Sequence, residues 1–218
     1  IDVPPGNVPD FIRSIPMEKA MHTDTLLATH MNGAPLTLPH GYPVRAAVPG
    51  WLGAASAKWL IEIRVISKEF EGNFMKPGYR FPEHEVAPGG EISPEETATI
   101  TSLPVKSILA RPGDGSHHKL GPIRISGAAW AGEADVTRVD ICTDGGRTWK
   151  PATLGRDKAR YAWQLFDYVW TPPKPGAYTI LSRATDDAGR TQPREPSWNP
   201  SGYLWNVVDQ VRIHVGAT

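Results

Sequence analysis

The chain has 218 residues, with 23 Lys plus Arg against 23 Asp plus Glu, so its formal net charge is zero. A neutral chain lacks the long-range field that draws proteins to nucleic acid or anionic membranes, and no apolar run reaches the roughly 18–20 residues of a transmembrane helix. The 22 Pro and 21 Gly residues predict a loop-rich protein that is more β than α, with room for one large or two smaller domains.

The first segment, residues 1–100, holds few signals for regular structure. A short helix is expected over Met17–Leu27, because good helix formers follow Pro16. Trp59–Ile66 is the clearest strand prediction, since it is rich in β-branched residues. Pro82–Pro94, with its Pro, Gly and Glu residues, is typical of a loop or linker. A domain with so little regular structure would bury a thin core by itself.

The second segment, residues 101–218, carries seven short runs of β character between turn signals. This pattern predicts an immunoglobulin-like β-sandwich. Trp130, Trp149, Trp163 and Trp170 suit its core and sheet faces, and an aromatic-lined binding groove is the alternative for them. The seven runs are PVKSILA, IRISGAAW, VTRVDIC, TWKPATL, YAWQLFDYVW, YTILSRATD and QVRIHV.

The sequence gives no metal site of its own. The single cysteine, Cys142, ends the run VTRVDIC before an Asp144–Gly146 turn, so we expect a buried strand residue rather than a reactive thiol. His117–His118 lack a Cys or His partner at ligand spacing. Two carboxylate pairs, Glu95–Glu96 and Asp186–Asp187, are expected to be solvated, because glycosidase chemistry needs a set separation across a cleft.

The stretch Met31–Leu60 holds the strongest functional signal. It carries His40, Arg45 and Lys58 on a backbone stiffened by prolines and turned by glycines. Three potential cations on such a loop suit an anionic ligand such as a phosphate or a pterin. The alternative is a surface loop whose charges are solvated.

Four motifs follow one another in this stretch: MNGAPL, HGYPVR, VPGWLG and KWL. In this order they closely resemble the molybdenum-cofactor domain of the sulfite oxidase family. Asp10–Leu27 resembles the segment that precedes it in bacterial members, and the chain from Ile108 onward resembles the family's immunoglobulin-like dimerisation domain. The resemblance implies a mainly β protein with an α+β first part. It would consist of an incomplete molybdopterin-binding domain over 1–100 and the dimerisation domain over 101–218.

The resemblance also assigns roles to residues. His40 and Arg45 match positions that contact the pterin and its phosphate, and Ser56 begins the family's second phosphate-binding stretch. Taken alone, His40 could equally cap a turn. The cofactor-binding residues that the resemblance implies are Asp2, His40, Arg45, Ser56, Ala57 and Lys58.

Tyr79, in NFMKPGYRFP, matches the family's active-site tyrosine at the same spacing from KWL. A phenol at that place could hydrogen-bond a bound oxyanion and assist proton transfer; an isolated Tyr would more often be a half-buried surface residue. Animal sulfite oxidases carry an arginine in a W-N-x-R-G motif, and here Ser201 stands in its place. The substrate is therefore open, with Arg190 and Arg194 as candidate replacements nearby in sequence.

The family implies a molybdenum–molybdopterin oxidoreductase, periplasmic, that oxidises sulfite or a related small oxyanion and passes two electrons to a separate acceptor such as cytochrome c. The family's molybdenum-ligating cysteine lies upstream of Met31, where this chain has none, so we expect an N-terminal half to be missing. That half could be a separate chain, and the enzyme would be inactive without it. A homodimer is expected, with no nucleic-acid or membrane partner. The alternatives are a nitrate-reductase-like molybdenum enzyme and a non-catalytic β-sandwich dimerisation or binding protein.

Overall fold

The computed structural model describes residues 9–217, which divide into two compact units. The first contains residues up to Ser102 together with Ser197–Tyr203, and the second contains Leu103–Pro196 and the chain from Leu204 onward. The return of Ser197–Tyr203 to the first unit differs from the sequence-based division, which assigns all residues beyond 100 to the second domain. No helix among residues 9–217 is long and apolar enough to cross a membrane.

The first unit is built from very short elements. Its strands pair in three two-stranded antiparallel sheets, β1 with β4, β2 with β3 and β5 with β6. Its buried apolar side chains are few, as expected for a thin core: Leu36, Val48, Ala55, Met75 and Ile100. The elements are α1 (Met17–Ala20), β1 (Leu26–Ala28), β2 (His30–Met31), β3 (Ala34–Pro35), η1 (Leu38–His40), β4 (Arg45–Ala47), η2 (Gly53–Ala55), β5 (Arg80–Pro82), η3 (Pro94–Glu96) and β6 (Thr97–Thr99).

The predicted helix over Met17–Leu27 is wrong beyond its first turn. Helix α1 ends at Ala20, and the Thr25 hydroxyl then donates to the carbonyl of Lys19, 2.8 Å away. Thr and Asp favour such local hydrogen bonds over a continued helix. The chain then enters β1, which pairs with β4.

The predicted strand over Trp59–Ile66 is also wrong. Within the described residues no strand pairs with this segment, and Trp59 has a left-handed φ of 51°. Ile61 is 94% exposed and Val65 is 81% exposed. A run of β-branched residues becomes a strand only when a neighbouring strand satisfies its backbone groups, so composition alone overstated the case.

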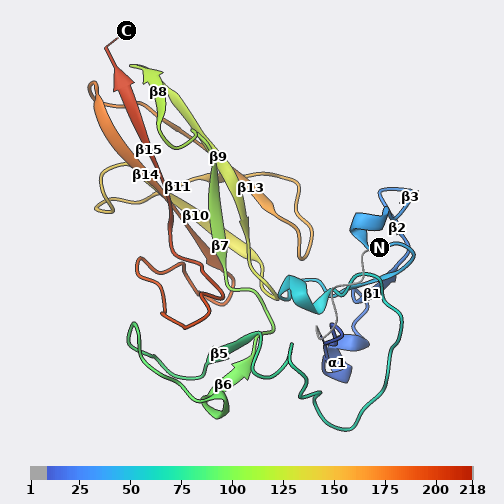
Figure 1. The fold of residues 1–218 in the computed structure, drawn as a ribbon. Helices are drawn as coiled ribbons and strands as arrows, with labels where there is room; N and C mark the ends of the chain where they lie inside the picture. Colours follow the sequence, from blue (N-terminus) through green and yellow to red (C-terminus); the bar gives the residue numbers. More distant parts are fainter. Residues whose placement is uncertain (1–8, 218) are drawn as a thin grey trace. The chain divides into compact units, whose positions relative to one another are not determined.

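The second unit is the predicted β-sandwich. Its sheets have the strand orders β11-β10-β14-β15-β8 and β12-β13-β9-β7, and Figure 1 shows the long strands of both. All pairs are antiparallel except β15 with β8. The strands are β7 (Lys106–Arg111), β8 (Ser116–Lys119), β9 (Ile123–Trp130), β10 (Val136–Cys142), β11 (Lys150–Pro151), β12 (Thr153–Leu154), β13 (Gln164–Trp170), β14 (Gly176–Asp186) and β15 (Asp209–Gly216).

The core of the sandwich is aliphatic, with Phe166 as its large aromatic side chain. Ile125, Val139, Ile180 and Ile213 are fully buried, and they come from strands of both sheets. Alternation along β13 and β15 places Phe166 and Ile213 on the inner faces of the sheets.

The tryptophans expected in the sandwich lie at the edge of this core or outside it. Trp170 packs against it beside Tyr178, whereas Trp163 is 61% exposed and stacks on Trp130 with ring centres 5.5 Å apart. The sheet-face prediction therefore describes Trp130 and Trp163 better than the core prediction does.

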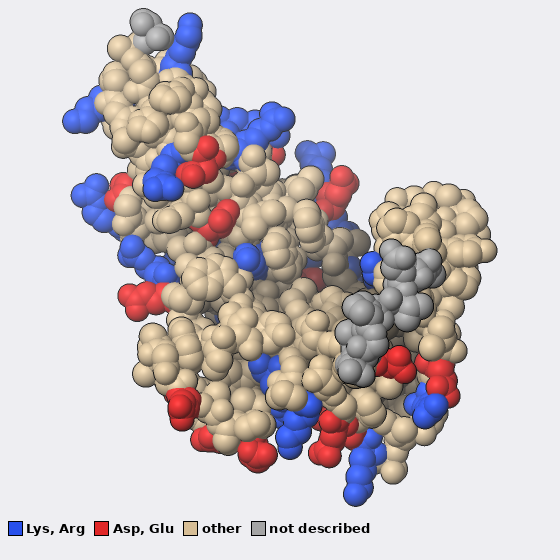
Figure 2. Space-filling model, in the orientation of Figure 1, with Lys and Arg blue, Asp and Glu red and all other residues tan. Residues whose placement is uncertain are grey.

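Charges of both signs are mixed on the one face that Figure 2 shows. On the face shown in Figure 2, Lys and Arg side chains lie among Asp and Glu side chains, so neither sign forms a continuous stripe there. This agrees with the zero net charge and gives that face no strong field.

Candidate functional site

Three of the cations singled out in the sequence meet in the first unit. Arg45 lies on β4, and the adjacent chain runs beside it, because Ala46 N donates to Ala57 O at 2.8 Å and Leu60 N to Val44 O at 2.9 Å. The Arg45 guanidinium donates to the carbonyls of His40 and Ser56, each 3.2 Å away. The structure thus brings His40, Arg45, Ser56, Ala57 and Lys58 into one cluster, which we call the cation loop.

Gly41 allows this close approach. Its φ is 103°, and a Cβ atom there would lie 3.0 Å from Lys58 Cβ and 3.1 Å from Arg45 Cβ. Any side chain at this position would push the two cationic side chains apart. The glycine in the HGYPVR motif is therefore a packing requirement of the cation loop.

The cation loop keeps hydrogen-bond donors for a ligand. Lys58 Nζ donates to Pro39 O at 2.9 Å, and His40 Nδ1 pairs with the Thr37 hydroxyl at 2.7 Å, while both side chains are exposed. An ammonium has three donors and a guanidinium has five, so Lys58 and Arg45 retain N–H groups beyond their recorded bonds. These groups fit an anion of the phosphate type.

Ser56 has a structural role in the loop in addition to the ligand-binding role expected of it. The Ser56 amide donates to Gly53 O at 3.0 Å, and its hydroxyl oxygen accepts from Val48 N at 2.9 Å, so this residue binds the loop as well as offering its O–H. Asp2 lies outside the described residues.

Tyr79 lies in an aromatic cluster of the first unit. Its ring stacks on that of Tyr203 with centres 5.5 Å apart, and the rings of Phe11 and Phe74 lie 6.3 and 6.4 Å from it. Tyr79 has a left-handed φ of 56°, an unfavourable conformation for a bulky residue that the surroundings must hold. Its carbonyl accepts from Ile100 N at 3.0 Å, which ties it to the chain after β6.

The next residue, Arg80, anchors this position. Its guanidinium donates to the hydroxyls of Thr97 at 2.7 Å and Thr99 at 3.1 Å, and also to the Thr97 carbonyl. Arg80 is thereby committed to β6. Among the described residues, no hydrogen bond or ring contact joins Tyr79 to His40, Arg45 or Lys58.

Sequence reasoning missed Arg13 and Tyr203. Arg13 Cζ lies 4.9 Å from the centre of the Tyr79 ring, and Tyr203 arrives with the Ser197–Tyr203 segment. That segment is a closed turn, because Asn199 accepts from Tyr203 N and donates to Tyr203 O. No spacing rule links residues this far apart in the chain. The one available signal was the WNPSGY motif itself.

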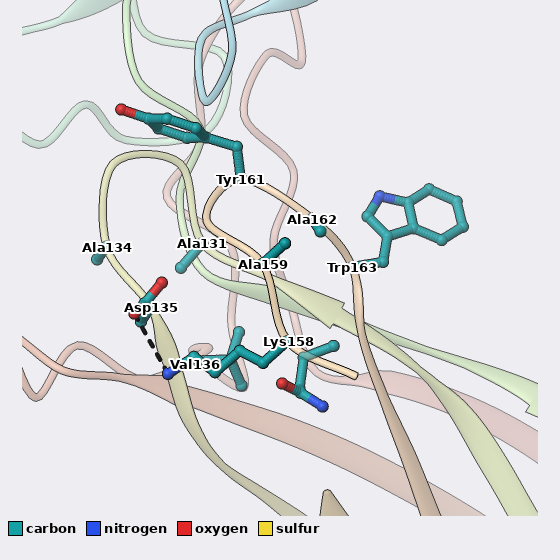
Figure 3. A pocket seen from close by; sticks show the side chains of 10 residues that line it. Ala131, Ala134, Asp135, Val136, Lys158, Ala159, Tyr161, Ala162 and Trp163 are labelled. Carbon is teal, nitrogen blue, oxygen red and sulfur yellow. Dashed lines mark ion pairs between the residues drawn. The ribbon is translucent and has the colours of Figure 1, made fainter. Parts of the chain in front are cut away.

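The second unit has a small hollow of its own, shown in Figure 3. Four of its ten lining residues are alanines, and Lys158 Nζ pairs with the Asp135 carboxylate across it at 3.2 Å. Because this ion pair occupies the hollow's charged groups, the hollow does not resemble a catalytic pocket.

Cys142 is the buried strand residue that the sequence predicts. It ends β10 with 1% exposure, its thiol donates to the Asp144 carboxylate at 3.0 Å, and Gly146 N donates to its sulfur. The Cys142 thiol, followed by Thr148 and the Arg147 amide, holds the pKa of Asp144 below its ordinary value. Cys142 therefore closes a hairpin.

The adjacent histidines point to different neighbours. His117 stacks on His214 of the parallel strand β15 with ring centres 5.0 Å apart, whereas His118 pairs with the Ser116 hydroxyl at 2.8 Å. Among the described residues no group of three or more His, Cys, Asp or Glu side chains could hold a metal ion.

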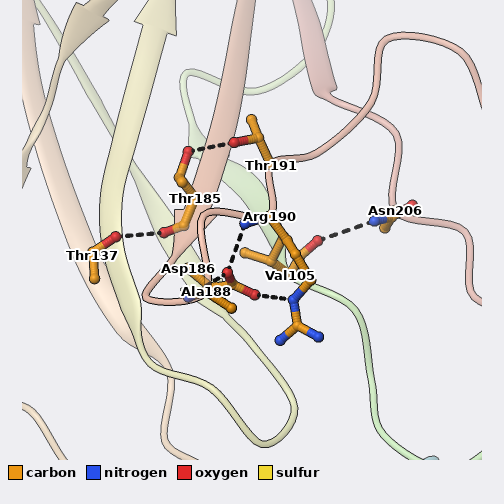
Figure 4. A network of polar contacts seen from close by, with 8 residues as sticks. All are labelled: Val105, Thr137, Thr185, Asp186, Ala188, Arg190, Thr191 and Asn206. Carbon is orange, nitrogen blue, oxygen red and sulfur yellow. Dashed lines mark hydrogen bonds and ion pairs between the residues drawn. The ribbon is translucent and has the colours of Figure 1, made fainter.

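The expectation that the paired carboxylates are solvated is wrong for Asp186. Its side chain is fully buried and accepts from the amides of Ala188 and Arg190 and from Arg190 Nε, 2.7 Å away (Figure 4). Asp186 thus closes the turn after β14, and Arg190 is committed to it. Glu95 and Glu96 are exposed as expected.

Comparison with known proteins gives two consecutive domain matches. Residues 2–74 match the family model of the oxidoreductase molybdopterin binding domain, and residues 97–216 match the Mo-co oxidoreductase dimerisation domain.

Similar proteins agree with these matches. Mitochondrial sulfite oxidase of Homo sapiens is 35% identical over 212 residues, covering 93% of this chain. Inducible nitrate reductase [NADH] 1 of Glycine max is 30% identical over 242 residues, covering 98%. The sulfane dehydrogenase SoxCD from Paracoccus pantotrophus has a solved structure that matches 91% of this chain and 50% of its own, with a TM-score of 0.79 and 30% identity. The chain spans 39% of the human enzyme and 26% of the soybean enzyme.

Proposed function

This chain belongs to the sulfite oxidase family of molybdenum-cofactor oxidoreductases, and from that membership we propose that it serves in the two-electron oxidation of sulfite or a related sulfur oxyanion. In this reaction sulfite and water give sulfate, two protons and two electrons. The observation that carries the proposal is the pair of consecutive domain matches, with the cation loop inside the first of them. A molybdenum–molybdopterin cofactor supplies the redox chemistry when bound.

The chain's own residues would bind the cofactor and orient the substrate. His40, Arg45 and Lys58 offer N–H donors to the cofactor's phosphate from one exposed loop. The Tyr79 phenol would donate a hydrogen bond to the substrate oxyanion, held in place by its aromatic neighbours. The two electrons would pass to a separate acceptor such as a c-type cytochrome, and a periplasmic location is the family-based proposal for that exchange.

The natural polypeptide purified from its source tests this function. We expect molybdenum by elemental analysis and reduction of cytochrome c that depends on sulfite. A metal-free protein without sulfite-dependent electron transfer would contradict the proposal. Nitrate reduction with a reduced dye donor, in place of sulfite oxidation, would favour the alternative that the similarity to the soybean enzyme supports. Cys142→Ser should leave the metal content unchanged, because that thiol lies within the hairpin.

A homodimer is the partner proposal that the dimerisation-domain match supports. The outer face of the four-stranded sheet offers a surface for it. Leu165 and Val169 of β13 are 57% and 65% exposed. Leu165 lies in register with Ala128, which pairs with Ile108, so an apolar row crosses three strands. Ala128 is itself only 5% exposed, so Leu165 and Val169 form the exposed part of this face. A second copy covering this face through a two-fold axis would bury the row.

We expect the wild-type protein to sediment as a dimer at micromolar concentration and the double variant Leu165→Glu/Val169→Lys to sediment as a monomer. In a two-fold interface each substitution places a charge on both copies, so the free-energy cost of burying it is paid by each copy. Leu120→Glu is the matched control, because Leu120 is 43% exposed on the same unit but lies outside the row. A monomeric wild-type protein, or a double variant that still dimerises, would refute this surface.

A further inference from the structure

Among the residues that the structure describes, Arg13 is a half-buried cation with no carboxylate paired to it. One terminal nitrogen, Nη1, donates to the carbonyl of Phe74, while Nε is buried and has no hydrogen-bond partner among the described residues. The guanidinium carbon lies 4.9 Å from the centre of the Tyr79 ring. Glu69 influences it only through space, and that carboxylate accepts a hydrogen bond from Thr99 at 3.0 Å.

Burying part of the Arg13 guanidinium costs free energy unless an anion accepts its remaining hydrogen bonds. Burial lowers the pKa of Arg13 from its ordinary value, and the attraction of Tyr79, Glu69 and Tyr203 acts in the opposite direction. A guanidinium has five N–H donors, and Arg13 uses one of them to bond another described residue, Phe74. Unpaired donors beside a partly desolvated charge favour an oxyanion, which can accept two parallel hydrogen bonds.

The surroundings suit a small anion. The rings of Phe11, Phe74 and Tyr79 form apolar walls in which a charge–charge attraction is less screened than in water. Phe11 is 46% exposed, so the cluster is open to solvent on that side. The Tyr79 and Tyr203 rings stack, and their hydroxyl groups are further donors in the same cluster.

Other arginines named as replacements for the missing guanidinium at Ser201 are engaged elsewhere. Arg190 pairs with Asp186 at 2.7 Å. The guanidinium of Arg194 packs on Gly146, where a Cβ atom would lie 2.7 Å from its Nη2. Both belong to the second unit, whereas Ser201, Tyr79 and Arg13 belong to the first.

We propose that Arg13 binds the oxyanion substrate beside Tyr79 and supplies the positive charge that Ser201 does not. The assignment rests on the proposed function, because it takes Tyr79 to lie at the substrate site. Arg13 is thus a specificity-determining residue for doubly charged tetrahedral or pyramidal oxyanions such as sulfate and sulfite.

Sulfate binding to the purified full chain, measured by calorimetry, tests the assignment without requiring turnover. We expect Arg13→Gln to weaken sulfate binding about tenfold to hundredfold, the range for losing hydrogen bonds from a charged group. Arg13→Lys keeps the charge but loses the fork, so a smaller loss is expected. The double variant Arg13→Gln/Ser201→Arg should recover part of the affinity.

Arg183→Gln is the matched control. Arg183 also lies over an aromatic ring, 4.2 Å from the centre of Trp149, and its Nε is also buried without a partner among the described residues. However, Arg183 pairs with Asp140 and belongs to the second unit, so its loss should leave sulfate binding unchanged. Unchanged binding in Arg13→Gln, or an equal loss in both variants, would overturn the assignment.

A second measurement needs no variant and so does not depend on folding of Arg13→Gln. Sulfate should slow phenylglyoxal modification of Arg13, read by peptide mass spectrometry, and should not protect the exposed Arg156. Equal rates at Arg13 with and without sulfate would refute the proposal. In the molybdenum-loaded enzyme, Arg13→Gln should raise the KM for sulfite more than it lowers kcat. Sulfate binding that needs Arg13 in a protein without sulfite oxidation would refute the proposed function and retain the anion site.

Discussion

Gly127→Ala is expected to lower the free energy of unfolding of the β-sandwich by about 3 kcal/mol or more, at the upper end of the overpacking range. A Cβ atom at Gly127 would lie 1.9 Å from the carbonyl oxygen of Ile108 and 2.6 Å from Cζ of Phe166. The carbonyl belongs to the neighbouring strand β7, and Phe166 is 1% exposed, so neither can move without disturbing the sheet or the core. Urea unfolding followed by tryptophan fluorescence measures the loss.

Gly113→Ala provides the control for this change. A Cβ atom at Gly113 meets nothing within 4 Å and its φ is not in the left-handed region, so the same substitution should be close to neutral there. The expected fall in melting temperature for Gly127→Ala exceeds about 10 °C for a domain of this size. Similar melting temperatures for the two variants would mean that the β7–β9 contact is not as close as the structure has it.

Arg45→Ala is expected to lower the cofactor content of the purified protein about tenfold to hundredfold, as for the loss of a charge-assisted phosphate contact. The same change removes the bonds from Arg45 to the carbonyls of His40 and Ser56, which hold the two sides of the cation loop together. Pterin fluorescence after denaturation and molybdenum analysis both report the loss. The sandwich should stay folded, because the cation loop belongs to the other unit.

Arg64→Ala is the matched control in the first unit. Its guanidinium is 75% exposed and pairs with Glu62 at 2.6 Å, so its removal should leave cofactor content unchanged. Arg45→Lys should retain part of the cofactor, since an ammonium keeps the charge but not the planar fork. A normal pterin content in Arg45→Ala would exclude Arg45 from the phosphate site.

Local sequence patterns predicted the sandwich well. Short β-rich runs between turn signals indicate strands, and alternation of apolar and polar residues within a run indicates a strand with one buried face. The runs ending at Cys142 and Trp170 form strands β10 and β13, as predicted. TWKPATL nevertheless divides into β11 and β12, which join different sheets, and SHHK forms β8 without any β-rich composition. The neighbouring strand with which each segment pairs determined these outcomes, and the composition of a segment does not reveal that neighbour.

Part of the cation loop could be predicted from the sequence. His40, Arg45 and Lys58 lie close enough in the chain for one Pro- and Gly-rich loop to bring them together, and the spacing of the motifs already favoured this. The same spacing could not show which donors the loop's own carbonyls would use.

The sequence by itself thus determined the β-sandwich and the adjacency of the cations in the loop, because both depend on neighbours in the chain. Only the tertiary structure decided that Arg13, Tyr79 and Tyr203 form one aromatic cluster, that Asp186 is buried and that Trp59–Ile66 has no partner strand among the described residues. These features depend on contacts between segments far apart in the chain. Their free energy comes from burial and from hydrogen bonds that form only once the fold has brought those segments together.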